Sequence, residues 1–264
     1  MTQDSPPGQS SDYPDTYSPA LLFAISRAPK RAAIGIADEL PFQGVDVWNA
    51  WELTWLNEDG RPSVAALEIR VPADSPQLIE SKSLKLYLNS FSMSRFASAG
   101  ALMDRICADL GNCVGAKVTA SLSMPADSEG GQTDALPGTC IDALDVACEH
   151  WEVRPELLRA AADSPVSEAL HSHLLRSLCP VTSQPDTGSL LIQYSGPKID
   201  AGSLLQYIVS FRRHCDFHEA CVERIFLNLI ERCAPEKLSV AAYYQRRGGI
   251  DINPFRSNFE SEPA

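Results

Sequence analysis

Two apolar, β-favouring runs open the regular part of the sequence. In AWELTWLNEDGRPSVAALEIRVPA, residues 50–73, the two runs lie on either side of NEDGRP. Asp59 and Gly60 in that linker are typical of tight hairpin turns, because both residue types tolerate the backbone conformations that such turns need. The pattern therefore predicts two antiparallel strands joined by a hairpin.

An amphipathic helix is predicted after Ser75-Pro76, a pair that suits an N-cap and a first helical position. Leu84, Leu88 and Phe91 then recur at i, i+4 and i+7, which is the spacing of one helix face. The polar positions on the other side are Lys82, Lys85 and Asn89.

The rest of this half continues with a helical pattern at 99–110, a β-like segment at 116–124 and an irregular surface loop at 125–138. The predicted order is thus strand, strand, helix, helix, strand. Residues 1–18 precede it and are rich in Ser, Pro, Asp and Gly, so they form a tail or a draped arm that cannot hold a structure alone.

The second half echoes this order. Residues 188–200 are strand-like, residues 201–233 are helical with an interruption near Asp216, and residues 237–249 are again β-like. The echo, which rests on element order alone, suggests a duplicated α+β module. We therefore divide the chain into modules at 19–150 and 151–264.

A helical bridge near residues 150–178 is predicted to join the modules, because apolar residues recur there at helical spacing. These residues are Leu170, Leu174, Leu175 and Leu178. Cys179 follows directly, and the segment Pro180 to Gly188 has the composition of a turn. A thiol on a rigid loop can be aimed at a ligand, although most cysteines are small buried hydrophobes.

An ionisable pair, His218 and Glu219, stands at the start of the last predicted helix. His218 lies on the stripe that continues with Val222, Ile225 and Leu229, so it is either a hydrogen-bonded core histidine or a site residue. The neighbouring residues His214, Cys215 and Cys221 offer metal-ligand types, but no CxxC or HExxH spacing accompanies them.

Two further clusters carry charge. ESKSLK places Glu80 beside Ser81, Lys82 and Lys85 within two turns, which is typical of a solvated helix face. YYQRRGG ends in Arg246, Arg247, Gly248 and Gly249, a set that could grip phosphates or simply end a strand. No GxGxxG follows a strand, so a Rossmann nucleotide site is not supported.

Composition narrows the classes of protein to which the chain can belong. With 264 residues, 44% of them hydrophobic, the chain can bury a sizeable core. Its net charge of −12 disfavours a nucleic-acid partner. No apolar run is long enough to span a membrane, no secretion signal is visible, and eight scattered cysteines fit a reducing compartment, so we expect a soluble cytoplasmic protein.

Several blocks together resemble one family. ESKSLKLYLNSF, LCPVTSQPD, FHEACVERIF and RRGGIDINPFRSN, with DVWNAWELTWLN before them, are similar to blocks of the long, two-module 7-cyano-7-deazaguanine reductases, the nitrile reductases of queuosine biosynthesis. The resemblance runs from Tyr17 to Asn258. It implies two tandem tunnelling-fold modules, each an antiparallel sheet with two helices, which assemble into a barrel in a homodimer.

The resemblance also implies roles for individual residues. Cys179 would be the nucleophile that adds to the substrate nitrile as a covalent thioimide, and Asp186 would be the acid/base residue. NADPH would be the reductant, and no metal is implied. The implied substrate-binding residues are Ile79, Glu80, Ser81, His218 and Glu219, and the implied cofactor-binding residues are Ser81, Lys82, Arg247 and Gly248.

One departure and two alternatives accompany this interpretation. Thr187 stands where the family usually has tryptophan, in QPDTGS, which puts the reaction rate more in doubt than the chemistry. A zinc-dependent cyclohydrolase of the same fold is the main alternative, and a purine-binding protein without activity is another. LCPVTSQPD supplies an acid where a zinc site needs ligands, which argues against the cyclohydrolase. Cys179 and Asp186 occurring together argues against the inactive protein.

Overall fold

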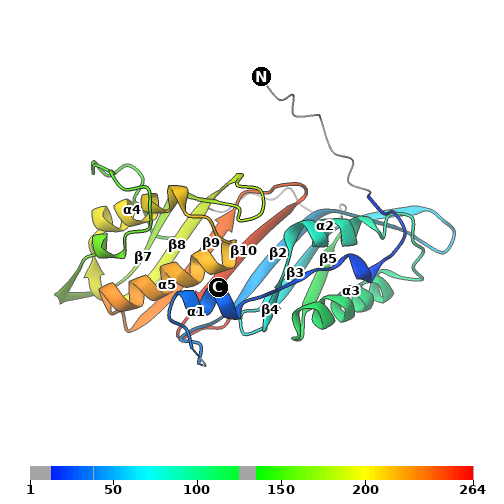
Figure 1. Ribbon diagram of the computed structural model, residues 1–264, viewed down its shortest axis with the longest axis horizontal. Helices are drawn as coiled ribbons and strands as arrows, with labels where there is room; N and C mark the ends of the chain where they lie inside the picture. Colours follow the sequence, from blue (N-terminus) through cyan, green and yellow to red (C-terminus); the bar gives the residue numbers. More distant parts are fainter. Residues whose placement is uncertain (1–12, 38, 125–134, 264) are drawn as a thin grey trace, which may run out of the picture.

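The computed structural model describes residues 13–37, 39–124 and 135–263. An eight-stranded sheet runs the length of this part in the order β5-β3-β2-β10-β9-β8-β7-β6 (Figure 1). The strands are β2 (Gln43–Leu56), β3 (Pro62–Pro72), β5 (Thr119–Ser123), β6 (Thr139–Cys140), β7 (Ala160–Leu178), β8 (Pro185–Ile199), β9 (Lys237–Tyr244) and β10 (Ile250–Ser257). Neighbours are antiparallel except β6 and β7, which are parallel.

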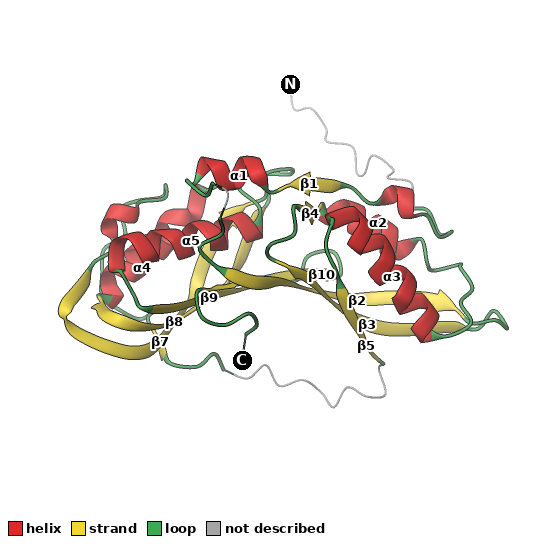
Figure 2. Cartoon of the chain, turned by 90° about the horizontal axis from the view of Figure 1, so that it is seen from below, coloured by secondary structure: helices red, strands yellow, loops and turns green. Residues whose placement is uncertain are grey.

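The helices cover one face of this sheet and leave the opposite face without helices, as Figure 2 shows. They are α1 (Ala28–Ala33), α2 (Ser81–Asn89), α3 (Ala99–Val114), α4 (Ala201–Val209) and α5 (His218–Cys233), with short 3₁₀ turns at Pro19–Leu21, Pro155–Leu157 and Ser210–Arg213. The chain is therefore an α+β protein, as the sequence predicted. Among the helices of the described residues, none is both long and apolar enough to cross a bilayer.

Two hydrophobic cores lie between helices and sheet. In the first, Leu84 of α2 and Phe91, which follows that helix, pack with α3 residues against β2 and β3. In the second, Val222 and Leu229 of α5 pack with Leu190 of β8 and with α4. The apolar spacings that predicted the helices are thus the faces buried in the cores, and the predicted break near Asp216 is confirmed by the turn between α4 and α5.

The hairpin at Asp59-Gly60 is confirmed, because β2 and β3 pair from Leu56↔Pro62 onward and Gly60 has φ +82°. The predicted helix start at Ser75-Pro76 is wrong. Gln77–Ile79 instead form strand β4, which pairs with β1 (Ala24–Ser26), and α2 begins at Ser81. The Ser75 hydroxyl donates to the carbonyl of Gln77 at 2.9 Å, so it stabilises a turn into a strand rather than a helix.

The predicted helical bridge at 150–178 is also wrong, because residues 160–178 form strand β7. Two register shifts interrupt its pairing with β8, at Ala161/Pro165 and at Ser172/Leu175. The second shift brings Leu170 and Leu175 to the same buried face although they are five residues apart. Leu174, between them, is 42% exposed. The leucines therefore recur at helix-like intervals in the sequence only because the bulge interrupts the alternation of the strand.

Strand β10 was not predicted, and it joins the two halves. It pairs with β2 from Ile250↔Ala50 to Ser257↔Gln43 and with β9 at Phe255↔Ala241. Its residues Ile250 and Ile252 belong to the core of the N-terminal half. The two halves therefore share one continuous sheet.

A buried ion network reinforces this junction. The guanidinium of Arg256 on β10 lies 2.7 Å from Asp46 on β2 and 2.9 Å from Glu223 on α5. Arg27 and Arg31 add pairs to Asp46 and Glu223 at 2.5 and 2.8 Å. Each buried charge thus has opposite charges in contact, as burial requires.

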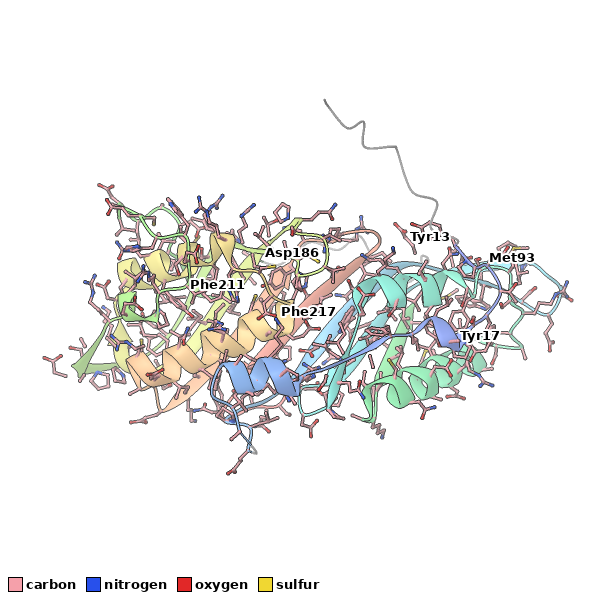
Figure 3. All side chains as sticks on the ribbon, viewed as in Figure 1. Tyr13, Tyr17, Met93, Asp186, Phe211 and Phe217 are labelled. Carbon is pink, nitrogen blue, oxygen red and sulfur yellow. The ribbon has the colours of Figure 1, made fainter. Side chains whose placement is uncertain are left out.

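Residues 13–18 of the predicted N-terminal tail lie against the N-terminal half. Tyr17 packs on Phe91 with ring centroids 5.2 Å apart, and its hydroxyl donates to Asp109 at 2.7 Å. Figure 3 shows Tyr17 beside the helices of the N-terminal half. This part is a draped arm; the remainder of the predicted tail, 1–12, and most of the predicted loop, 125–134, lie outside the described residues.

Candidate active site

A small cavity at the junction of the two halves collects most of the predicted site residues. Ile79 and Ser81 come from the N-terminal half, and Cys179, Asp186, His218, Glu219 and Arg247 come from the C-terminal half. Figure 3 labels Asp186 and Phe217, both of which line it. Its volume of about 20 Å³ is little more than one water molecule needs, so a bicyclic ligand enters only if lining side chains move.

Cys179 lies at the first position after β7, in a tight turn. Its N–H donates to the carbonyl of Gln184 at 2.9 Å, and its carbonyl accepts from the N–H of Ser183 at 2.9 Å. Ser183 has φ +56°, a left-handed conformation unusual for a residue other than glycine. The cysteine is 8% exposed, so the turn holds the thiol in a fixed place at the cavity wall.

The surroundings favour the thiolate of Cys179. Burial alone raises the pKa of this thiol, but hydrogen bonds outweigh that effect and bring the pKa below its ordinary value. The donors are the hydroxyl and N–H of Thr182, the N–H of Val181 and the guanidinium of Arg247. Other buried thiols differ, since burial raises the pKa of Cys233 to about 11. Among these, Cys179 has the environment of a nucleophile.

Asp186 lies between an imidazole and a guanidinium group. Its Oδ2 lies 3.2 Å from Nε2 of His218, and its Oδ1 lies 3.1 Å from the guanidinium of Arg247. Arg247 also donates to Oε1 of Gln184 at 2.7 Å, which ties it to the Cys179 turn. The carboxylate is 7% exposed, so it can exchange protons only with groups at the cavity.

His218 is stacked on Tyr244 of β9, with centroids 3.8 Å apart and planes 11° from parallel. This contact fixes the plane of the imidazole toward Asp186. Its other nitrogen, Nδ1, is buried and has no hydrogen-bond partner among the described residues. Such an unpaired polar atom in a site is available for a ligand.

Glu219 is a buried carboxyl group with an unpaired oxygen. It is 3% exposed, and its Oε1 has no partner within the described part of the chain. Burial, followed by the negative charge of Asp46, raises the pKa of Glu219 to about 7. A buried acceptor of this kind suits the N–H groups of a polar heterocycle.

Glu80 is placed differently from the other predicted residues. It is the N-cap of α2, and its two carboxylate oxygens accept from the N–H groups of Lys82 and Ser83 at 3.0 and 2.7 Å. It does not line the small cavity, although its neighbours Ile79 and Ser81 do.

Lys82 and Gly248 line a second, neighbouring cavity of about 240 Å³ with Lys85 and Gly249. Gly248 has φ +60°, and a Cβ there would lie 3.2 Å from Nζ of Lys85. Burial, followed by the charge of Arg247, lowers the pKa of Lys85. Two lysine side chains beside bare backbone suit phosphate groups, and the carboxylate of Glu52 also lines this cavity.

The described residues do not assemble a metal centre at the small cavity. The pair His214 and His218 with Cys215 and Cys221 does not bring three ligand atoms together in the part of the chain described here. The cluster of suitable side chains that does form lies elsewhere, at Cys140, His171 and His173.

Sequence reasoning missed Tyr244, Thr182 and Trp48. Trp48 faces the cavity from β2, and its alternation with Ala50 in DVWNAW could have placed it on the helix-covered side. Tyr244 and Thr182 act only through contacts across the fold, so neither gives a signal in the sequence.

Comparison with known proteins decides the family. Residues 13–122 match the family described as "Nitrile reductase, 7-cyano-7-deazaguanine-reductase N-term", and residues 185–263 match the family described as "QueF-like protein". A protein of Chromobacterium violaceum named "NADPH-dependent 7-cyano-7-deazaguanine reductase" is 49% identical over 99% of this chain and 94% of its own length. This chain belongs to the 7-cyano-7-deazaguanine reductase family.

Relatives of the same name from Azoarcus sp. strain BH72 and Burkholderia multivorans are 52% and 51% identical, over 98% and 97% of this chain and 92% and 94% of their own lengths. The resemblance seen in the sequence is therefore confirmed. The two family matches include Asp186, His218 and Arg247, while Cys179 falls in the interval between them.

Proposed function

We propose that this chain reduces the nitrile of 7-cyano-7-deazaguanine to the aminomethyl group of 7-aminomethyl-7-deazaguanine with NADPH, a step of queuosine biosynthesis. One observation carries the proposal. In a chain about half identical to proteins with that named activity, a thiol with a lowered pKa shares a buried cavity with a carboxylate and an imidazole.

Cys179 is the nucleophile of the proposed reaction. Its proton passes to Asp186 as the sulfur bonds to the nitrile carbon and one π pair of the C≡N bond moves to nitrogen. Asp186 then delivers that proton to the nitrogen, which leaves a neutral thioimide, so this step needs no outside acid. His218 supplies later protons through Asp186, to which its Nε2 lies 3.2 Å distant.

Glu219 is the proposed anchor for the amino and ring N–H groups of the base, because its unpaired oxygen gains a donor when such a ligand binds. Ile79 and Ser81 complete this wall of the cavity. Glu80 is the second proposed anchor. Its carboxylate already caps α2 and must also accept hydrogen bonds from the ligand.

Ser81, Lys82, Arg247 and Gly248, together with Lys85, would hold NADPH through its phosphates. When bound, NADPH supplies hydride, and two equivalents are needed because nitrile to amine is a four-electron reduction. The cavity that would receive it adjoins the catalytic one, since Arg247 and Gly248 are adjacent in sequence.

The assembly proposed is a homodimer in which the sheets of two chains close into a tunnelling-fold barrel, with modules at 19–150 and 151–264. The sheet of one chain is open, with edges at β5 and β6, and its helix-free face exposes Trp51 and Val64 by 48% and 52%. Light scattering should give a mass twice that of the 28.7 kDa chain, whereas a monomer of full activity would contradict the barrel.

The test of the catalytic proposal is mass spectrometry of the intact protein mixed with 7-cyano-7-deazaguanine and no NADPH. We expect one substrate mass on each chain, and two NADPH oxidised per amine once NADPH is added. Cys179→Ala should lose both adduct and turnover, while Asp186→Asn should slow adduct formation by about 10²–10⁴-fold. Turnover by Cys179→Ala, or an adduct on another cysteine, would reject the mechanism.

A further inference from the structure

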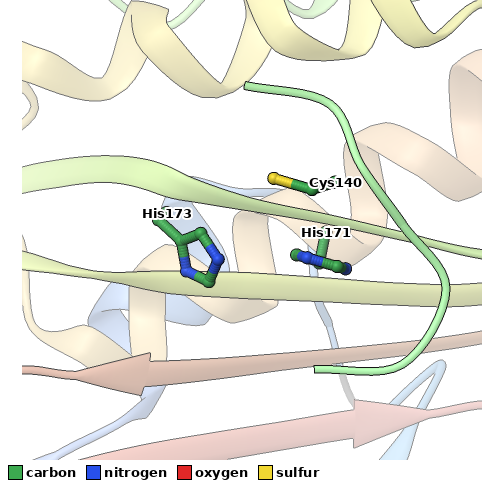
Figure 4. Close-up of side chains that lie close together, drawn as sticks. All are labelled: Cys140, His171 and His173. Carbon is green, nitrogen blue, oxygen red and sulfur yellow. The ribbon is translucent and has the colours of Figure 1, made fainter. Parts of the chain in front are cut away.

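A second group of reactive side chains lies at the edge of the sheet, away from the catalytic cavity. Cys140 on β6 and His171 and His173 on β7 bring their sulfur and ring nitrogen atoms within 4.8 Å of one another (Figure 4). None of the three lines the cavity that contains Cys179. The proposed reaction leaves this cluster unexplained.

The cluster is on the face of the sheet opposite the helices. His171 pairs with Leu191 of β8, whereas the flanking residues Leu190 and Ile192 point into the core beneath α4 and α5. His173 contacts Ser189, which has the same orientation as Leu191 because side chains alternate along a strand. Both imidazoles therefore lie on one surface, and Cys140 is the parallel-strand partner of His171.

The hydrogen bonds leave a lone pair free on His171. Its Nδ1 lies 3.0 Å from the carbonyl oxygen of Pro137, which can only accept, so Nδ1 carries the proton and Nε2 of the neutral ring does not. This arrangement, one ring nitrogen on a carbonyl and the other free, is the one that metal-binding histidines adopt. His173 has a similar contact, from Nδ1 to the hydroxyl of Ser189 at 2.7 Å.

The backbone around the cluster is held in place. Asp142 accepts from the hydroxyl of Ser172 at 2.6 Å and from the N–H of His173 at 3.0 Å, which clamps the segment after Cys140 onto β7. At Gly138, a Cβ would lie 2.1 Å from the carbonyl oxygen of Ala169, so only glycine permits this approach. Yet β6 itself has only two paired residues, Thr139 and Cys140.

We propose that Cys140, His171 and His173 bind one Zn²⁺ per chain, with water as the fourth ligand. One thiolate and two imidazoles are a ligand set typical of tetrahedral zinc. Ligand atoms in such a site are about 3.3–3.6 Å apart, and the exposed side chains of Cys140 and His173 can rotate to reach that spacing. Binding releases the thiol proton to solvent and fixes β6 to β7, and it does not depend on the proposed reaction.

The test uses the untagged full chain, reduced and freed of metal, in a Cys179→Ala background so that the catalytic thiol cannot contribute. Calorimetric titration with ZnCl₂ should give one site per chain. Cobalt(II) should give a sulfur-to-metal charge-transfer band. Adding Cys140→Ala should abolish that band and weaken zinc binding at least 10-fold, and His171→Ala should also weaken it at least 10-fold.

The controls are Cys148→Ala and His150→Ala, which remove a nearby cysteine and an exposed histidine outside the cluster and should leave binding unchanged. In a protein that keeps His171, one equivalent of zinc should slow the alkylation of Cys140 at least 10-fold. Zinc should not slow the alkylation of Cys148. Absence of a stoichiometric site, or equal binding by the Cys140→Ala protein, would overturn the proposal.

Discussion

Replacing Glu219 by glutamine should make the protein more stable at alkaline pH while it binds substrate less tightly. In the folded protein this carboxyl group is buried, and burial, with Asp46 as the second cause, raises its pKa from an ordinary 4.5 to about 7. The folded state therefore prefers the protonated form. Above pH 7 it must bury a charge that no described residue pairs at Oε1.

The sign and size follow from proton linkage. Between the two pKa values the unfolded chain has lost the proton and the folded chain keeps it, so the stabilisation is fully present below pH 4.5 and is lost as the pH rises through 7. A shift of that size corresponds to about 3 kcal/mol. Glutamine does not titrate, so its advantage over glutamate should grow by about 2–3 kcal/mol between pH 5 and pH 8.

Glu223→Gln is the matched control, one turn further along α5. Burial alone raises the pKa of Glu223, but the guanidinium groups of Arg256 and Arg31 outweigh this and hold it below its ordinary value. Its stabilisation is therefore present above the ordinary pKa and lost at lower pH. Breaking this buried pair should destabilise the protein by about 3–5 kcal/mol at pH 8, opposite in sign to Glu219→Gln.

The assay is urea unfolding followed by tryptophan fluorescence at pH 5 and pH 8, with wild type and both variants compared at each pH. Affinity for 7-cyano-7-deazaguanine is measured in parallel, and Glu219→Gln should weaken it about 10–100-fold through loss of a charge-assisted hydrogen bond. A stability difference between Glu219→Gln and wild type that does not change with pH would refute the reasoning.

Three further changes test neighbouring contacts. Thr182→Val removes a hydroxyl that lowers the pKa of Cys179, so the pH profile of Cys179 alkylation should move to higher pH. The control Thr187→Val should leave the profile in place, and an unchanged profile in both variants would contradict the hydrogen bond from Thr182. Glu80→Ala and Asp200→Ala, at the equivalent N-caps of α2 and α4, should each lower the free energy of unfolding in urea by about 0.5–2 kcal/mol. Only Glu80→Ala should also weaken substrate binding, and equal substrate affinities of the two variants would contradict the role of Glu80 as an anchor. Arg247→Lys should slow adduct formation about 10-fold, because lysine cannot contact Asp186 and Gln184 at the same time. The rate is measured by mass spectrometry of samples quenched at successive times, and an unchanged rate would contradict a role for that double contact.

The sequence predicted those elements whose periodicity is uninterrupted. The hairpin at Asp59-Gly60 and the faces of α2 and α5 follow from local spacing alone, and they were found where expected. Strand β7 was mistaken for a helix because a bulge at Ser172/Leu175 puts two leucines five residues apart on one face. A bulge depends on the partner strand, so its effect on spacing cannot be read from one segment.

The candidate site shows the same division. Cys179 and Asp186 could be predicted as site residues because a turn sequence and a family resemblance point to them. The fold brings both to one cavity. What tunes them could not be nominated. Thr182 acts on the thiol, and Tyr244 on the imidazole, through contacts that exist only after the strands have paired. Arg247 was predicted as a cofactor-binding residue, but its hydrogen bond to the thiol was not predicted. The double role of Glu80 as cap and proposed anchor was invisible for the same reason.

The unpaired state of Glu219 follows from how the two halves are joined. Strand β10 brings Arg256 between Asp46 and Glu223, and Arg27 and Arg31 contact those same two carboxylates. The arginines of the junction are thereby occupied, and the oxygen Oε1 of Glu219, one turn before Glu223, receives no donor from the described residues. A network that joins the two halves thus leaves one buried acceptor unsatisfied in the wall of the proposed catalytic cavity. The stability lost there is recovered only when a ligand supplies the donor, which is why the substitution that stabilises the free protein should weaken binding.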